Sequence, residues 1–172
     1  MNITTKIIIT DTNIITDLYN ANILEDFINI DNVFICDMIK NDEINFKTCN
    51  INLINKFKVM TATANQLLEV TTLECVEKKL SLYDLLNFVI ARDNNCILAT
   101  GDNRLKIYSE NNGVEVIRTL KIIKLMKDKN MISCKRAIDA CNLLKNCKKT
   151  RIPENEINNL IYELEKDAIT II

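Results

Sequence analysis

The chain has 172 residues, of which 48% are hydrophobic and 26% charged, and its formal net charge is −1. These values are typical of a globular protein with a sizeable core, and no apolar run reaches the roughly 18–20 residues of a membrane helix. The chain has no histidine, which excludes Cys/His zinc sites and histidine bases, and its two glycines leave no room for a Gly-rich phosphate loop. A cytoplasmic location is expected because the N-terminus lacks a signal-peptide pattern.

The seven cysteines are an odd number and form no C-x-x-C pair. Such a set is typical of reduced thiols in an intracellular protein. Five of them are expected to be core residues: Cys36, Cys75, Cys96, Cys134 and Cys141.

Charge is distributed unevenly along the chain. Residues up to Glu115 hold 10 basic and 16 acidic side chains, whereas residues from Val116 onward hold 12 basic and 7 acidic ones. The basic excess is greatest between Arg118 and Arg151. It can be a solvated helix surface, or it can meet phosphates or an acidic partner.

Short apolar runs alternate with helical patterns along the first two thirds of the chain. Strands are expected at 7–10, 33–36, about 59–60, 96–99 and 114–117. The helical patterns between and after them cover about 14–18, 23–28, 38–43, 64–78, 81–93, 104–111, 120–129, 133–147 and 153–166. This alternation predicts a three-layer α/β/α fold with a central, mostly parallel sheet in residues 1–118. Residues 119–172 are predicted to form a basic, helical C-terminal extension packed on it.

Four carboxylates stand where expected elements join. Asp11 and Asp102 each follow a buried strand, Glu43 lies in the helix after the second strand, and Asp84 lies in the first turn of the helix at Ser81. In a parallel sheet, strand ends and the helices that follow them share one edge, so these side chains can converge. Asp11 and Asp102 can equally be helix caps, Asp84 can form a capping box with Ser81, and Glu43 can be an exposed helix residue.

Convergence of these acids indicates a metal site. Close carboxylates repel each other by about 4 kcal/mol per pair at an effective dielectric near 20, and a divalent cation removes that repulsion. Oxygen ligands with no histidine or cysteine beside them favour Mg²⁺ or Mn²⁺.

These motifs resemble those of PIN domains in order and rough spacing. Thr-Gly-Asp at 100–102 is the most specific piece, followed by Asp-Thr-Asn at 11–13, and the likeness covers about residues 5–118. The C-terminal extension is similar to that of a prokaryotic PIN subgroup. One departure is Arg104, which stands where many family members have a further acid, and another is Lys121, where a glycine is common.

The resemblance implies a metal-dependent ribonuclease that cleaves single-stranded RNA. It assigns the catalytic role to Asp11, Glu43, Asp84 and Asp102, with Asp11, Asp84 and Asp102 as ligands of Mg²⁺ or Mn²⁺. The supporting residues are Thr12, Asn13 and Thr100. Contacts with the RNA backbone are expected from Arg104, Lys121 and Lys124.

Two other functions fit the same residues. One is a catalytically inactive PIN-like module that binds RNA or a partner protein. The other is a Mg²⁺-dependent phosphatase or phosphotransferase. Such an enzyme often has a second Asp two residues after the first, and this chain has Asn13 there. Because many PIN ribonucleases are toxins, the expected partners are RNA, a small antitoxin protein and a second copy of the chain, with no membrane.

Overall fold

The computed structural model describes residues 4–43 and 51–170, with side chains for 4–42 and 51–167. Within these ranges the chain forms a sheet of five parallel strands in the order β3-β2-β1-β4-β5. The strands are β1 (Ile8–Thr10), β2 (Val33–Cys36), β3 (Lys58–Met60), β4 (Ile97–Ala99) and β5 (Val116–Ile117). The predicted three-layer α/β/α fold with a parallel sheet is therefore confirmed.

The helices follow the sequence pattern closely. They are α1 (Thr12–Asn20), α2 (Leu24–Ile28), α3 (Ile51–Ile54), α4 (Ala64–Val76), α5 (Leu82–Asp93), α6 (Asn103–Asn111), α7 (Thr119–Asp128), α8 (Cys134–Asn146) and α9 (Glu154–Thr170). A π-helix, Ile39–Glu43, follows β2 where an α-helix was expected. The helix α3 was not predicted, and β5 begins two residues later than expected.

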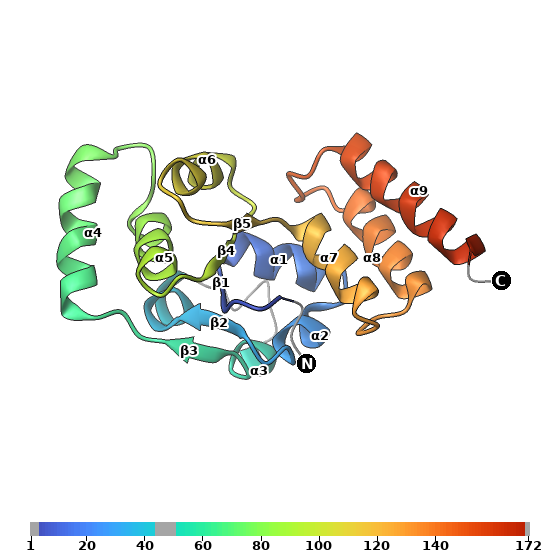
Figure 1. The fold of residues 1–172 in the computed structure, drawn as a ribbon, viewed down its shortest axis with the longest axis horizontal. Helices are drawn as coiled ribbons and strands as arrows, with labels where there is room; N and C mark the ends of the chain where they lie inside the picture. Colours follow the sequence, from blue (N-terminus) through green and yellow to red (C-terminus); the bar gives the residue numbers. More distant parts are fainter. Residues whose placement is uncertain (1–3, 44–50, 171–172) are drawn as a thin grey trace.

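Both faces of the central strands are covered. Every residue of β1 and β4 is buried, as expected for a parallel sheet between two helical layers. The helix α5 packs against β1 and β4, and α4 packs on α5 as a further outer helix. On the other side of the molecule, α1 contacts α7 and α8, and α9 packs on α8 (Figure 1).

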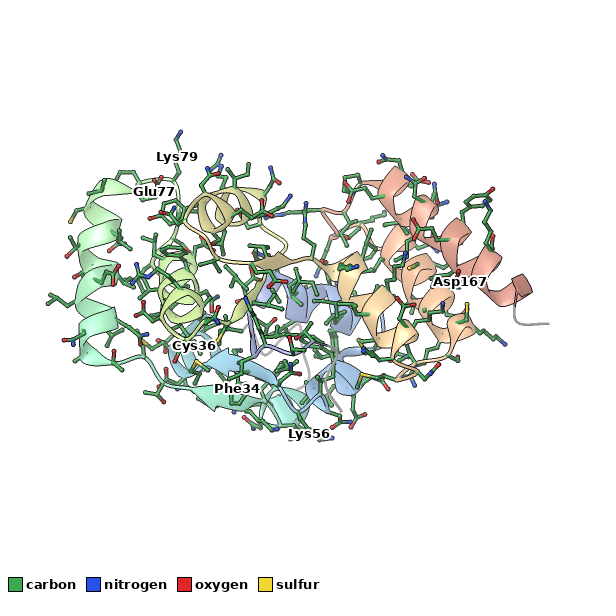
Figure 2. The ribbon with its side chains drawn as sticks, in the orientation of Figure 1. Phe34, Cys36, Lys56, Glu77, Lys79 and Asp167 are labelled. Carbon is green, nitrogen blue, oxygen red and sulfur yellow. The ribbon has the colours of Figure 1, made fainter. Side chains whose placement is uncertain are left out.

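The C-terminal extension is attached to the sheet-bearing part by buried contacts as well as by sequence. Its apolar side chains belong to the same core cluster as those of the strands, for example Ile122, Leu144 and Leu164. Lys127 on α7 bonds Asp167 on α9, and Arg136 on α8 bonds Asp26 at 2.7 Å. Figure 2 labels Asp167 on α9. Exposed ion pairs of this kind contribute little, so the apolar packing holds the extension in place.

The described cysteines are all unpaired thiols. Cys36 (Figure 2), Cys96 and Cys141 are buried, and Cys134 is half-buried. The expectation for Cys75 was wrong, because this residue is exposed on α4. In the described part of the chain, no helix is long and apolar enough to cross a bilayer.

Candidate functional site

Asp11 and Asp102 lie at one edge of the sheet, after the neighbouring strands β1 and β4. The N–H of Asp11 donates to the carbonyl oxygen of Ala99 at 3.0 Å, so the two strands stay paired up to this edge. The chain leaves β1 toward β2 but leaves β4 toward β5, so the direction of the connections reverses between β1 and β4. Ligand sites of open α/β sheets lie at the carboxyl ends of strands at such a reversal. This edge is therefore the candidate active site.

Asp11 is buried, with only 3% of its surface exposed. One oxygen, Oδ1, caps α1 by accepting a hydrogen bond from the Ile14 N–H at 3.1 Å, and Oδ2 accepts one from the Thr100 hydroxyl. Burial raises the pKa of the Asp11 carboxyl from 3.8 to about 7, although these hydrogen bonds lower it, and the negative charge of Asp84 adds to the rise. Near neutral pH this carboxyl is thus only partly ionised, and a bound cation would favour its charged form.

Thr100 connects the two strand ends. Its fully buried hydroxyl donates to Asp11 and accepts a hydrogen bond from the Asp102 N–H at 3.0 Å. One side chain therefore fixes both the Asp11 carboxylate and the start of the loop that carries Asp102.

Asp102 and Asp84 are both half-buried helix caps. Oδ1 of Asp102 accepts hydrogen bonds from the N–H groups of Arg104 and Leu105 at 2.7 and 2.9 Å, which starts α6. Oδ2 of Asp84 accepts hydrogen bonds from the N–H and the hydroxyl of Ser81 at 2.9 and 2.8 Å, completing a capping box at α5. The second oxygen of each carboxylate accepts no hydrogen bond from any described residue, so it is available to a ligand.

The remaining predicted site residues are less completely placed. Glu43 ends the π-helix after β2, but its side chain lies outside the described residues. Thr12 and Asn13 form the first turn of α1, directly after Asp11. The carbonyl oxygen of Thr12 accepts a hydrogen bond from Thr16 at 2.9 Å, and Asn13 is exposed.

Three of the four acids are thus connected, two by charge and two through a shared threonine. Asp84 is close enough to Asp11 to influence its pKa, and Asp102 joins Asp11 through Thr100. Among residues whose side chains are described, no three Asp, Glu or Cys side chains lie together as a ready-made metal site.

The basic residues predicted to meet RNA differ in their surroundings. Arg104 is exposed in the first turn of α6, next to Asp102, and Lys121 is exposed in the first turn of α7. Lys124 instead bonds Glu163 on α9 and so joins two helices of the extension.

Sequence reasoning missed Asp17 on α1. Its Oδ2 accepts a hydrogen bond from the Thr119 hydroxyl at 2.8 Å, at the start of α7. Burial raises the pKa of Asp17, while Thr119, Arg118 and Arg151 lower it. No local pattern signals this role, because Thr119 lies 102 residues further along the chain.

Searches of family models, of curated proteins and of solved structures find nothing that matches this chain. The case for a function therefore rests on the residues themselves.

Proposed function

We propose that this chain is a PIN-like, metal-dependent ribonuclease that cleaves single-stranded RNA. The observation that carries the proposal is the pairing of Asp11 with Asp102 at the reversal between β1 and β4, where Thr100 bonds to both. The Thr100 hydroxyl donates to the Asp11 carboxylate and accepts from the Asp102 backbone N–H, so it places both acids at the sheet edge where open α/β sheets bind ligands.

The donor set fits Mg²⁺ or Mn²⁺. Asp11, Asp84 and Asp102 would hold the ion, and Glu43 would complete the site or position the water. Asp84 and Asp102 each have a second oxygen that no described residue bonds, so both can be ligands without giving up their caps. Burial and the charge of Asp84 both raise the pKa of Asp11, because they disfavour its ionised form. A cation bound to this carboxylate would favour the ionised form.

A divalent cation, if held by these carboxylates, would lower the pKa of its bound water and stabilise negative charge on the scissile phosphate, so no histidine base would be required. The other site residues would position the acids and the RNA. Thr100 holds Asp11 in place, Thr12 and Asn13 shape the start of α1, and Arg104 faces solvent beside Asp102, where it can contact a phosphate.

Cleavage of a labelled single-stranded RNA in Mn²⁺ tests the proposal. We expect Asp11→Asn and Asp102→Asn to abolish cleavage yet remain folded, because asparagine is also a good helix cap. Asp128→Asn, which changes an exposed acid outside the site, is the matched control and should cleave normally. Undiminished cleavage by both site variants would reject the assignment.

A second candidate is an inactive PIN-like module that binds RNA or a protein. It is favoured by the caps that Asp84 and Asp102 form and by the lack of three clustered acids among the described side chains. A Mn²⁺ titration separates the two functions, since binding to the folded state raises the melting temperature and an incompetent site leaves it unchanged.

If the chain cleaves RNA in the cytoplasm, its activity needs control. We propose a small antitoxin protein as its regulator. The test is to produce the chain together with each short reading frame that neighbours its gene. A stable complex that cleaves less RNA supports the pairing, and the lack of any co-purifying product contradicts it.

A further inference from the structure

A pocket of about 100 Å³ lies where the candidate active-site edge meets the C-terminal extension. Its walls come from the first turns of α1, the Gly101 loop, the start of α7 and the segment before α9. Because about 10–15 Å³ holds one water molecule, a group as large as a phosphate fits.

The pocket adjoins the proposed catalytic residues. Its lining includes Asn13, two residues after Asp11, and Gly101, which directly precedes Asp102. A Cβ added at Gly101 would lie 3.2 Å from the Cβ of Asn13, so the Gly101 loop packs directly on the first turn of α1. A ligand in the pocket therefore touches the segments that carry Asp11 and Asp102.

Three basic side chains line this pocket: Arg118, which directly precedes α7, and Lys149 and Arg151, which precede α9. Arg118 donates to the carbonyl oxygen of Gly101 at 3.2 Å. Lys149 and Arg151 are exposed, and within the described structure neither forms an ion pair.

Several basic side chains of the extension bond acids, as Lys124 does with Glu163, Lys127 with Asp167 and Lys145 with Glu154. Lys149 and Arg151 differ from these three because they line a pocket and are not used in such pairs within the described structure. Both can therefore meet an external anion.

Two acids also line the pocket, against three basic side chains, so its lining keeps a formal excess of one positive charge. Burial raises the pKa of Asp17, whereas its hydrogen bond from Thr119 and the charges of the two arginines in the pocket lower it. Glu156 is exposed in the first turn of α9. The start of α7 adds positive potential, because Arg118, Thr119 and Leu120 line the pocket and no described side chain caps this helix.

We propose that this pocket binds a phosphate group, and that in the RNA complex this is a backbone phosphate next to the one that is cleaved. Arg151 and Lys149 supply the charge, and the N–H groups at the start of α7 supply hydrogen bonds. The RNA part of the proposal rests on the proposed ribonuclease function, whereas phosphate binding does not.

Equilibrium binding of a labelled single-stranded RNA, measured with EDTA at several salt concentrations, tests the pocket without any cleavage. We expect the double variant Lys149→Gln/Arg151→Gln to bind roughly tenfold more weakly, with a salt slope shallower by about 0.7 for one lost phosphate contact. The control is Lys129→Gln/Lys148→Gln, which removes the same charge from exposed positions outside the pocket and should stay within about twofold of the wild type.

The outcomes separate the two proposals. If RNA binding depends on the pocket but the wild type never cleaves RNA in Mn²⁺, the pocket stands and the ribonuclease function falls. If inorganic phosphate or adenosine monophosphate raises the melting temperature of the wild type but not of the pocket variant, and RNA does not bind, the ligand is a small phosphate and the RNA part is wrong. If the pocket variant binds RNA and phosphate as the wild type does, or if neither ligand binds, the pocket proposal is overturned.

Discussion

At the scale of single residues, the candidate site is organised by one hydroxyl group. The Thr100 hydroxyl bonds the carboxylate of Asp11, 89 residues earlier in the chain, and the N–H of Asp102, two residues later. The acids and Thr100 could be singled out from sequence because each stands at a strand end, where a parallel sheet gathers its functional groups. Asp17 could not, because its bond to Thr119 depends on how the extension packs on α1.

Replacing Thr100 tests its role in holding Asp11. We expect Thr100→Val to lower the free energy of unfolding by about 1–3 kcal/mol at pH 8, because a buried carboxylate loses its donor. Thr100→Ser keeps the hydroxyl and should be closer to the wild type. Urea unfolding followed by circular dichroism measures both, and equal losses in the two variants would show that the methyl group matters instead.

The pKa of Asp11 predicts how stability depends on pH when EDTA keeps metal away. The folded-state pKa of about 7 lies above the ordinary 3.8, so the folded protein holds a proton that the unfolded chain releases. Stability from this group is complete below about pH 4, is lost as the pH rises to about 7, and totals about 4 kcal/mol. Asp11→Asn should make the free energy of unfolding less dependent on pH between about 4 and 7. Parallel pH profiles for the wild type and Asp11→Asn would contradict the raised pKa of Asp11.

At the scale of elements, the sequence predicted the strands and the long helices well. Continuous β-branched runs mark strands covered on both faces, and caps such as Ser81 and Ser133 mark helix starts. The π-helix at Ile39–Glu43 escaped prediction because its wider turn has the same local residue preferences as an α-helix. The four-residue α3 is too short to show a hydrophobic period.

Two capping boxes provide a matched pair of tests. Ser81→Ala removes two hydrogen bonds that involve Asp84, and Thr63→Ala breaks the equivalent box at the start of α4. Each change should lower the free energy of unfolding by about 1 kcal/mol. Only Ser81→Ala should also reduce Mn²⁺-dependent cleavage, by roughly tenfold, because Asp84 loses its support. A similar drop in cleavage for both variants would mean that stability alone is responsible.

At the scale of the whole molecule, the sheet-bearing part and the extension share one hydrophobic core. The helices α7 and α8 both contact α1, and α1 begins at Asp11. The extension therefore packs against the helix that Asp11 caps, and its Lys149 and Arg151 line the pocket that we propose binds phosphate. The prediction of an extension packed on the sheet-bearing part followed from its helical patterns, but which helix it would cover could not be read from sequence.

A core substitution in the extension tests whether the two parts unfold together. Leu144 on α8 is fully buried, so Leu144→Ala should lower the free energy of unfolding by about 2–5 kcal/mol. The far-ultraviolet and tyrosine signals should still change in one common transition. Two separate transitions would show that the extension folds as an independent unit.

The central claim is that the acids at the reversal between β1 and β4 hold a divalent cation. A crystal structure of the wild type soaked with Mn²⁺, with data collected at the manganese absorption edge, tests it most directly. We expect an anomalous peak within coordinating distance of Asp11 and of at least one of Asp84 and Asp102. We expect no such peak in crystals of Asp11→Asn. A wild-type crystal with Mn²⁺ in the solvent and no peak at this edge would contradict the claim.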